Sequence, residues 1–159
     1  MTVAYVALGA NIGDPRRQLE AAIEQLKNLP DTDFVLVSGF YRSAPLGYVD
    51  QADFLNAVAR LDTTLPAEQL LEYLQKMEQQ QSRERSFPNA PRTLDLDLLL
   101  YGDSILASPR LTLPHPRMHE RAFVLLPLLE LDSEISIPGK GKASALLSAC
   151  GSQKIERID

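Results

Sequence analysis

Two aspartates, Asp95 and Asp97, interrupt an otherwise almost wholly apolar run that extends from Arg92 to Gly102. The length of the run, the Pro91 and Gly102 that bound it and the lack of a polar helical face predict a buried β-strand. Side chains two apart on a strand point to the same face, so the two carboxylates are expected side by side, about 7 Å apart, with the neighbouring leucines on the other face. Burying an unpartnered charge costs several kcal/mol, so the pair requires protons, arginine partners or a metal.

Two neighbouring carboxylates suit a hard cation, above all Mg²⁺, which takes one or two protein carboxylates and completes its shell with water and substrate phosphates. Cationic side chains flank the strand in the sequence: Arg83, Arg85, Arg92, Arg110, His115, Arg117, His119 and Arg121. A metal ion and guanidinium groups together bind the oxygens of a polyphosphate, so this set of residues indicates phosphoryl transfer. The alternative, two ordinary aspartates on a solvent-facing strand, leaves the surrounding cations without a reason.

The composition limits the classes of partner. The chain has 159 residues, 45% of them hydrophobic, and we predict a single domain over residues 1–159 with its core in residues 2–131. The net charge of −5 argues against nucleic-acid binding, because the positive charge gathers only around the aspartate strand. We therefore expect a monomer that binds a small anionic ligand and no nucleic acid.

No targeting or membrane segment is predicted. The strand-like residues Thr2–Leu8 carry no basic flank, and the most apolar later run, Ala122–Leu131, falls well short of the roughly 20 residues needed to cross a bilayer. The single Cys150 has no cysteine partner for an internal disulfide and no Cys or His at metal-ligand spacing. These features predict a protein of the cytoplasm that does not bind membranes.

The hydrophobic pattern predicts the order β-α-β-β-α-β. Strands are expected at residues 2–8, 33–42 and 54–62 and in the aspartate stretch, and helices from Pro15 to about Leu29 and from the Thr63–Glu68 start to about Gln81. An extended piece over Arg110–Pro116 and a helix from about Met118 to Leu131 follow, and the tail from Ser136 to Asp159 is expected to be peripheral. This order is that of a ferredoxin-like α+β sandwich with a C-terminal extension.

A second group of residues suits a flat heterocycle. Phe54 and Asn56 are two apart on a predicted strand, beside an irregular connection over residues 43–51, and an aromatic ring next to a carboxamide can stack on a ligand and bond its polar edge. Gln75 and Glu78 share one face of a helix that leads to the cationic loop. The structural alternatives stay open: Phe54 in the core, Asn56 at a strand edge, and Glu78 in a surface pair at a helix end.

Five segments occur together in the order typical of one known family: Tyr5–Asp14, Phe40–Gly47, Phe54–Asn56, Pro91–Asp97 and Leu113–Pro116. The fourth contains a Pro-Arg-x-x-Asp-x-Asp signature that is specific to that family. Together the segments closely resemble hydroxymethyl-dihydropterin pyrophosphokinase (HPPK) of folate biosynthesis, and the resemblance spans about residues 2–131.

The resemblance implies an ATP-dependent transferase in which the hydroxymethyl oxygen of 6-hydroxymethyl-7,8-dihydropterin attacks the β-phosphorus of ATP and AMP is released. It implies two Mg²⁺ ions, bound with ATP at Asp95 and Asp97, and catalytic roles for these aspartates with Arg83 and Arg92. The implied ATP-binding residues are Gln75, Glu78, Arg83, Arg92, Leu98, Arg110, Leu111, Thr112, His115 and Arg121. The implied pterin-binding residues are Ser43, Ala44, Leu46, Phe54, Asn56 and Phe123.

One segment departs from the family pattern. Many members have a basic residue and a tryptophan before Gly-Pro-Arg, where this chain has Pro88 and Asn89 before Ala-Pro-Arg in a slightly shorter loop. The sequence therefore does not identify the contact by which that loop closes over the substrate, and Arg85 and Phe87 are candidates to replace the missing pair.

Two other classes of function fit parts of the pattern. A non-catalytic ligand-binding module is common among ferredoxin-like domains, but such a module does not need paired metal carboxylates within a ring of arginine and histidine. A Mg²⁺ phosphohydrolase would use the carboxylates and would release phosphate or pyrophosphate without pterin. Formation of AMP from ATP with Mg²⁺ and the pterin separates the pyrophosphokinase from both.

Replacing Arg92 with alanine is expected to lower the turnover number by about 100-fold and nucleotide affinity by less than about fivefold. The reason is that a guanidinium facing the transferred group meets charge that develops in the transition state. Single-turnover rates and the dissociation constant of a non-hydrolysable ATP analogue measure the two effects separately. A loss confined to affinity would make Arg92 an anchor for the ground state only.

Overall fold

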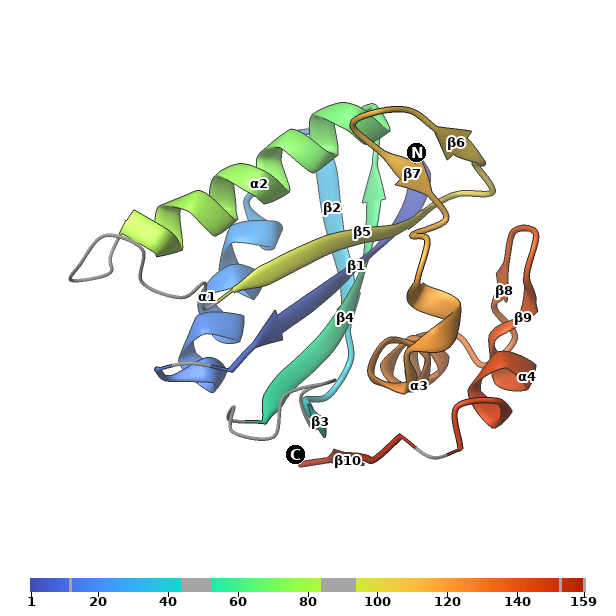
Figure 1. Cartoon of the computed structure of the whole chain (residues 1–159). Coiled ribbons are helices and arrows are strands. Elements are labelled where there is room, and N and C mark those ends of the chain that lie inside the picture. Colours follow the sequence, from blue (N-terminus) through green and yellow to red (C-terminus); the bar gives the residue numbers. More distant parts are fainter. Residues whose placement is uncertain (12, 44–52, 84–93, 152, 159) are drawn as a thin grey trace.

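The computed structural model describes residues 1–11, 13–43, 53–83, 94–151 and 153–158, and within these residues six strands form one antiparallel sheet (Figure 1). The strands are β1 (Thr2–Ala10), β2 (Thr32–Val37), β3 (Tyr41–Ser43), β4 (Phe54–Thr63), β5 (Asp95–Tyr101) and β10 (Ile155–Arg157). Their order is β10-β3-β4-β1-β5, and β2 pairs with β4 along the same edge as β3. The molecule is thus a mixed α and β protein built on an antiparallel sheet.

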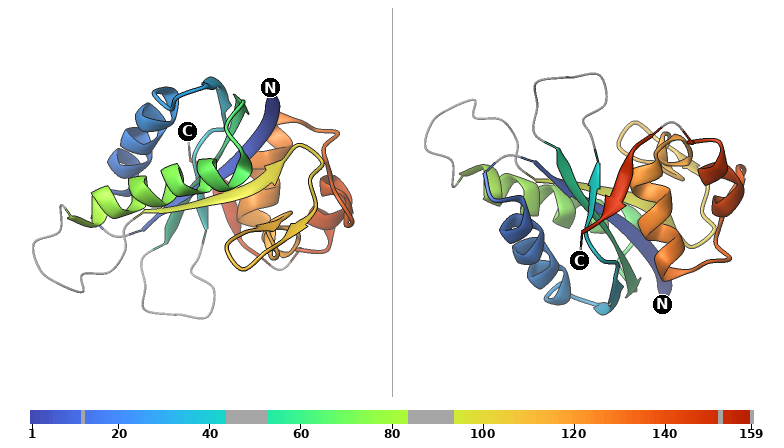
Figure 2. Two further views of the ribbon diagram at one scale, coloured as in Figure 1. Left: turned by 90° about the horizontal axis from the view of Figure 1, so that it is seen from above. Right: turned by 90° about the horizontal axis from the view of Figure 1, so that it is seen from below.

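Helices cover both faces of this sheet (Figures 1 and 2). On one face lie α1 (Pro15–Lys27) and α2 (Ala67–Arg83), and on the other lies α3 (Ala122–Leu131), with α4 (Ala143–Ser148) beside it. The short elements are β6 (Leu106–Ala107), β7 (Thr112–Leu113), the 3-10 helix η1 (Met118–Glu120), β8 (Ser136–Ile137) and β9 (Gly141–Lys142). No helix of the described residues has the length and apolar character needed to span a membrane.

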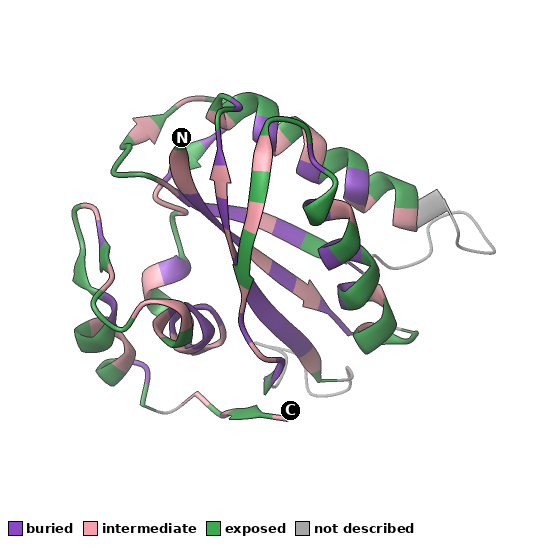
Figure 3. Cartoon of the chain, turned by 180° about the vertical axis from the view of Figure 1, so that it is seen from behind, coloured by how far each residue is buried: buried purple, intermediate pink, exposed green. Residues whose placement is uncertain are grey.

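The helix α1 forms where the sequence provides both a start signal and an apolar stripe. Asp14 caps α1 by accepting a hydrogen bond from the Arg17 N–H at 3.2 Å, and Pro15 occupies the first turn. Leu19 and Leu26 of α1 are fully buried in one hydrophobic cluster with the inward side chains of α2, β1 and β5. Figure 3 shows these buried stripes along the helices and strands.

The single strand predicted over residues 33–42 is instead two strands, β2 and β3, separated at 38–40. At the break, the Ser38 N–H donates to the Val58 carbonyl at 2.9 Å, and the Ser38 hydroxyl accepts from the Val58 N–H at 3.0 Å. A side-chain oxygen thus takes the place of a backbone carbonyl in the ladder, and the chain bends toward the edge where β3 forms. The hydrophobic pattern of the segment carries no sign of this substitution.

The strand predicted for the aspartate stretch is present as β5, and it contains a β-bulge. Val6 of β1 lies opposite Leu98 while Tyr5 lies opposite Leu100, so Leu99 is an extra residue. Before the bulge, the leucines of β5 alternate into the cluster against α1 and α2, whereas Leu99 and Leu100 both pack in the cluster against α3. The aspartates precede the bulge and therefore lie on the α3 side of the sheet.

The helix predicted from about Met118 to Leu131 is divided into two parts. Met118–Glu120 forms η1, and α3 begins only at Ala122, because Arg121 between them has extended backbone with φ −118° and ψ 109°. α3 then buries Val124, Leu125 and Leu128 against the sheet.

The segment after α3 is more closely integrated than the peripheral tail predicted for residues 136–159. Ile137, Ala143 and Cys150 are buried in the same cluster as α3. β10 joins the main sheet, with Ile155 opposite Ser43 of β3. Periodicity did not reveal this docking, because the elements of the segment are only two to six residues long.

Glu130, near the end of α3, joins the helix to the sheet. Its carboxylate accepts a hydrogen bond from the Gly39 N–H at 3.0 Å and another from the Tyr41 hydroxyl at 2.5 Å. The same carboxylate lies 3.8 Å from the guanidinium of Arg157 in β10. Three segments, α3, the turn before β3 and β10, therefore meet at one acidic side chain.

The substitution Glu130→Ala is expected to lower the free energy of unfolding by about 2–3 kcal/mol, because it removes a charged acceptor from two donors. The matched control is Glu134→Ala, since the Glu134 side chain is 80% exposed beside Lys142 and its loss should cost less than about 0.5 kcal/mol. Urea denaturation measures both values. Equal costs for the two variants would show that Glu130 does not hold the helix to the sheet.

Candidate active site

The aspartates stand at one end of a row of residues that crosses the sheet. Asp95 lies opposite Gly9 of β1, Gly9 lies opposite Asn56 of β4, and Asn56 lies opposite Tyr41 of β3. Opposed residues on neighbouring strands point to the same face, so Asn56 and Asp95 share one face about 10 Å apart. Gly9 between them has no side chain, and a Cβ added there would lie 3.5 Å from Asn56 Oδ1. The surface between the carboxamide and the carboxylate therefore stays open.

The backbone between the two aspartates is fixed by α2. Leu96 N–H donates to Glu78 Oε2 at 2.8 Å, and Leu96 itself is buried. Asp95 is exposed and the Asp97 side chain is 45% exposed, so both carboxylates reach solvent from a rigid strand. The bond from Glu78 thus holds the strand that presents the acidic pair.

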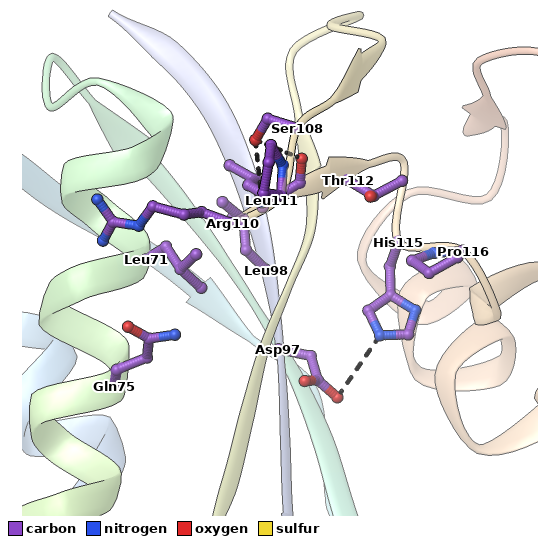
Figure 4. A pocket seen from close by; sticks show the side chains of 11 residues that line it. Leu71, Gln75, Asp97, Leu98, Ser108, Arg110, Leu111, Thr112, His115 and Pro116 are labelled. Atoms are coloured by element: carbon purple, nitrogen blue, oxygen red, sulfur yellow. Dashed lines mark hydrogen bonds and ion pairs between the residues drawn. The ribbon is translucent and has the colours of Figure 1, made fainter.

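A cavity of about 240 Å³ opens beside Asp97, between α2 and the segment that follows β6 (Figure 4). It is lined by Leu71, Gln75, Asp97, Leu98, Ser108, Pro109, Arg110, Leu111, Thr112, His115 and Pro116. Three parts of the chain meet there: one face of α2, the middle of β5, and the 108–116 segment. The cavity joins apolar walls to an acidic edge and two basic side chains.

His115 faces Asp97 across this cavity, with Nε2 at 4.0 Å from Asp97 Oδ2 (Figure 4). Burial lowers the pKa of His115; the charge of Asp97 opposes that shift, and Arg121 and Arg117 reinforce it. The lowered pKa favours the neutral imidazole at neutral pH. Its Nδ1 accepts a hydrogen bond from the Arg117 N–H at 3.2 Å, which leaves the proton on Nε2, directed toward the cavity.

Arg110 closes the opposite side of the cavity. Its guanidinium lies 2.9 Å from Glu72 of α2, and both side chains are about half exposed, so the pair contributes little to stability. The backbone of this segment is fixed instead by Ser108, whose hydroxyl accepts from the Leu111 N–H at 3.1 Å. Arg110 is thus a cation held near the cavity by a weak partner.

Of the described residues predicted to bind a heterocycle, Asn56 and Phe123 lie on the same side of the sheet as the aspartates, outside this cavity. Asn56 is buried, and its Nδ2 donates to the Ser43 hydroxyl at 2.7 Å. Phe123, in the first turn of α3, is partly buried, and the Arg121 guanidinium lies 5.6 Å from the centre of its ring. Arg121 therefore contacts Phe123, one of the residues predicted to bind the heterocycle, and acts electrostatically on His115 in the cavity.

A family model described as 7,8-dihydro-6-hydroxymethylpterin-pyrophosphokinase (HPPK) matches residues 5–133. The chain belongs to the HPPK family. The resemblance noted in the sequence is thereby confirmed, and so is the prediction of an enzyme of the pyrophosphokinase class.

Two bacterial relatives match nearly the whole HPPK chain, and both are named 2-amino-4-hydroxy-6-hydroxymethyldihydropteridine pyrophosphokinase. That of Pseudomonas aeruginosa is 47% identical over 154 residues, covering 97% of this chain and 95% of its own. That of Haemophilus influenzae is 42% identical over 159 residues, covering 100% and 99%. Among solved structures, Plasmodium falciparum HPPK-DHPS aligns with a TM-score of 0.71 at 14% identity over 93% of this chain, which shows a shared fold. This chain spans 45% of that longer chain.

The structure brings together part of the predicted nucleotide site. Gln75, Leu98, Arg110, Leu111, Thr112 and His115 line the cavity with Asp97. Glu78, Arg121 and Asp95 do not line it, and the described hydrogen bond of Glu78 runs to the Leu96 backbone. Ala44, Leu46, Arg92 and the side chain of Arg83 lie outside the described part of the chain, as do Arg85 and Phe87.

Four residues that line the cavity were missed in the sequence: Leu71, Ser108, Pro109 and Pro116. Leu71 lies one helical turn before Gln75 and could have been found from that spacing. Ser108 and Pro109 directly precede Arg110 as a turn signal, but a turn gives no indication of which side chains it brings to a cavity.

Asp95 and Asp97 are suited to a metal ion whose remaining coordination positions are filled by water and by the phosphates of a bound substrate. Within the described residues no group of three or more His, Cys, Asp or Glu side chains could by itself hold a metal. Asp95 and Asp97 offer an all-oxygen pair on one strand face, both open to solvent, which is the donor set that suits Mg²⁺ with phosphate and water as further ligands.

The substitution Glu78→Ala is expected to lower HPPK turnover by about tenfold and stability by about 1–3 kcal/mol, because it leaves the Leu96 N–H unpaired between the aspartates. Glu78→Gln keeps an acceptor and should stay close to the parent in both properties. Gln79→Ala, at the next, exposed position of α2, is the control. Steady-state kinetics and thermal unfolding check these values. A glutamine variant as impaired as alanine would show that the charge of Glu78 is required, and not only its acceptor oxygen.

Proposed function

We propose that this chain transfers the β,γ-diphosphate of ATP to the hydroxymethyl oxygen of 6-hydroxymethyl-7,8-dihydropterin and releases AMP, as a step of folate synthesis. Membership of the HPPK family supports this activity. The observation that carries the proposal for this chain is the cavity beside Asp97, where an apolar wall, Gln75 and two basic side chains meet the acidic strand.

Asp95 and Asp97 would hold Mg²⁺ together with ATP, and two ions are expected. Their exposed position on a single strand face supports this assignment. When bound, Mg²⁺ supplies charge neutralisation and Lewis acidity at the phosphate oxygens.

The side chains around the cavity have separate roles toward ATP. Leu98 and Leu111 offer an apolar surface to the nucleotide, with Gln75 and Thr112 at its polar edge. Neutral His115 donates from Nε2 to a phosphate oxygen, and Arg110 adds positive charge at the rim. Arg121, with Arg83 and Arg92 as predicted from the sequence, completes the cationic side of the triphosphate site.

The pterin would lie over the open surface at Gly9. Asn56, held by Ser43, bonds the polar edge of the heterocycle, and the rings of Phe54 and Phe123 flank its faces. Along the Asn56–Gly9–Asp95 row, the hydroxymethyl group then points from the carboxamide toward the acidic strand. Positioning the attacking oxygen beside the β-phosphorus, with its O–P bond forming as the bond to AMP breaks, is the main work of the site.

The finer statements about the fold and setting remain part of the proposal. The antiparallel order β5-β1-β4-β2 with α1 and α2 on one face supports a ferredoxin-like core followed by a C-terminal extension, all in a single domain. A monomer located in the cytoplasm, binding small-molecule substrates, no membrane and no nucleic acid, stays a prediction.

The decisive test is the stoichiometric formation of AMP from ATP with Mg²⁺ and 6-hydroxymethyl-7,8-dihydropterin. Chromatography of the nucleotides should show AMP only when the pterin is present. Release of phosphate or pyrophosphate without pterin would favour a phosphohydrolase, and binding of both ligands without any turnover would favour a ligand-binding module.

The variants Asp95→Asn and Asp97→Asn are each expected to fold and to lose at least ~1,000-fold in AMP formation, because a metal ligand is removed where electrostatic stabilisation supplies most of the catalysis. Asp103→Asn, in the exposed turn after β5, is the matched control. Turnover is measured over a range of Mg²⁺ concentrations, with circular dichroism to confirm folding. Near-normal turnover in either site variant would exclude that carboxylate from the metal site.

A further inference from the structure

A side chain from the C-terminal segment holds the backbone around Arg121. Gln153 Nε2 donates to the Glu120 carbonyl at 2.7 Å, and Gln153 Oε1 accepts from the Ala122 N–H at 2.8 Å. These two groups belong to the residues directly before and after Arg121. One carboxamide therefore bridges the extended residue between η1 and α3, as a neighbouring strand would.

This bridge answers a local need of the chain. Arg121 is the N-cap residue of α3 and makes no side-chain cap, so the first amide of the helix has no partner within the helix. A carboxamide can accept from that amide and donate to the preceding carbonyl at once through two separate atoms, whereas an ionised carboxylate has no proton to donate. Gln153 is thus chemically suited to fix both sides of one residue.

Arg121 lies close to both parts of the candidate site, the cavity and the residues predicted to bind the heterocycle. The Arg121 guanidinium lies 5.6 Å from the centre of the Phe123 ring, and it is close enough to His115 to act on it electrostatically. The Arg121 backbone is bonded to both helices: its N–H donates to the Met118 carbonyl at 3.3 Å, and its carbonyl accepts from the Val124 and Leu125 N–H groups at 3.0 Å. Gln153 adds a bond on each side of this residue, at Glu120 and at Ala122.

Gln153 is itself anchored with respect to the sheet. Its N–H donates to the Cys150 carbonyl at 3.0 Å, and β10 follows directly, with Ile155 opposite Ser43 and Arg157 beside Glu130. The position of the Gln153 carboxamide therefore depends on β10, which pairs with β3 and contacts α3 through Arg157 and Glu130.

We propose that Gln153 is a positioning residue for Arg121 and so brings the C-terminal segment into the nucleotide site. The proposal rests on the proposed function, in which Arg121 contacts the triphosphate of ATP. It assigns a role in ATP binding to a residue that does not line the cavity.

A double-mutant cycle tests this coupling directly. The parent, Gln153→Ala, Arg121→Ala and the double variant are compared in binding a non-hydrolysable ATP analogue with Mg²⁺ by calorimetry and in kcat/KM for ATP. Gln153→Ala should weaken binding about tenfold in the parent and less than about twofold when Arg121 is already alanine, because its effect passes through that arginine. Gln153→Glu, which keeps the acceptor and loses the donor, should fall between the parent and Gln153→Ala.

Lys154→Ala, at the neighbouring exposed position, is the matched control and should bind the analogue like the parent. Thermal unfolding of each variant separates a loss of fold from a loss of positioning. An equal loss from Gln153→Ala in both backgrounds, or no loss in the parent, overturns the proposal. A parent that binds the analogue but forms no AMP contradicts the proposed function, and the binding cycle then still decides the role of Gln153.

Discussion

The alternation of β5 is the constraint on which the rest of the structure depends. Leu96 and Leu98 of this strand, and Leu94 just before it, must be removed from water, and the cluster beneath α1 and α2 receives them. The two aspartates are then forced to the other face, because successive side chains on a strand point in opposite directions. Hydrophobic burial on one face therefore places the acidic pair on the other without any dedicated interaction.

The second layer of the molecule covers that other face only in part. The bulge at Leu99 turns the end of β5 toward α3, so the same strand is apolar where α3 packs and acidic where the sheet is open. The 108–116 segment borders the cavity beside Asp97 and brings the basic side chains of Arg110 and His115 to it. The candidate cavity lies beside this strand, between α2 and the 108–116 segment.

The core of this fold was predictable, because β1, β4, β5, α1 and α2 each carry a long and regular pattern, such as the alternation around Asp95 or the stripe through Leu70 and Leu74. What periodicity could not reveal were features made by single polar contacts. The hydroxyl of Ser38 divides a predicted strand, and extended backbone at Arg121 divides a predicted helix.

The candidate site shows the same division between pattern and contact. Seven of the residues that line the cavity could be named from the family resemblance: Gln75, Asp97, Leu98, Arg110, Leu111, Thr112 and His115. Gln153 could not be named, because it is distant in sequence from the arginine that it supports, and nothing in its surroundings resembles a ligand-binding motif.

The pairing of β10 with β3 also bears on the order in which the protein is completed during synthesis. Long-range strand pairs form late, because the entropy of closing a long loop is lost before the strand contacts can offset it. Ser43 leaves the ribosome long before its outer partner Ile155. The sheet and its two helices can assemble while the chain is still growing, but the wall formed by β3, α3 and Gln153 closes only after translation has passed residue 157. Catalytic competence should therefore appear after the core has folded, as a separate step of maturation.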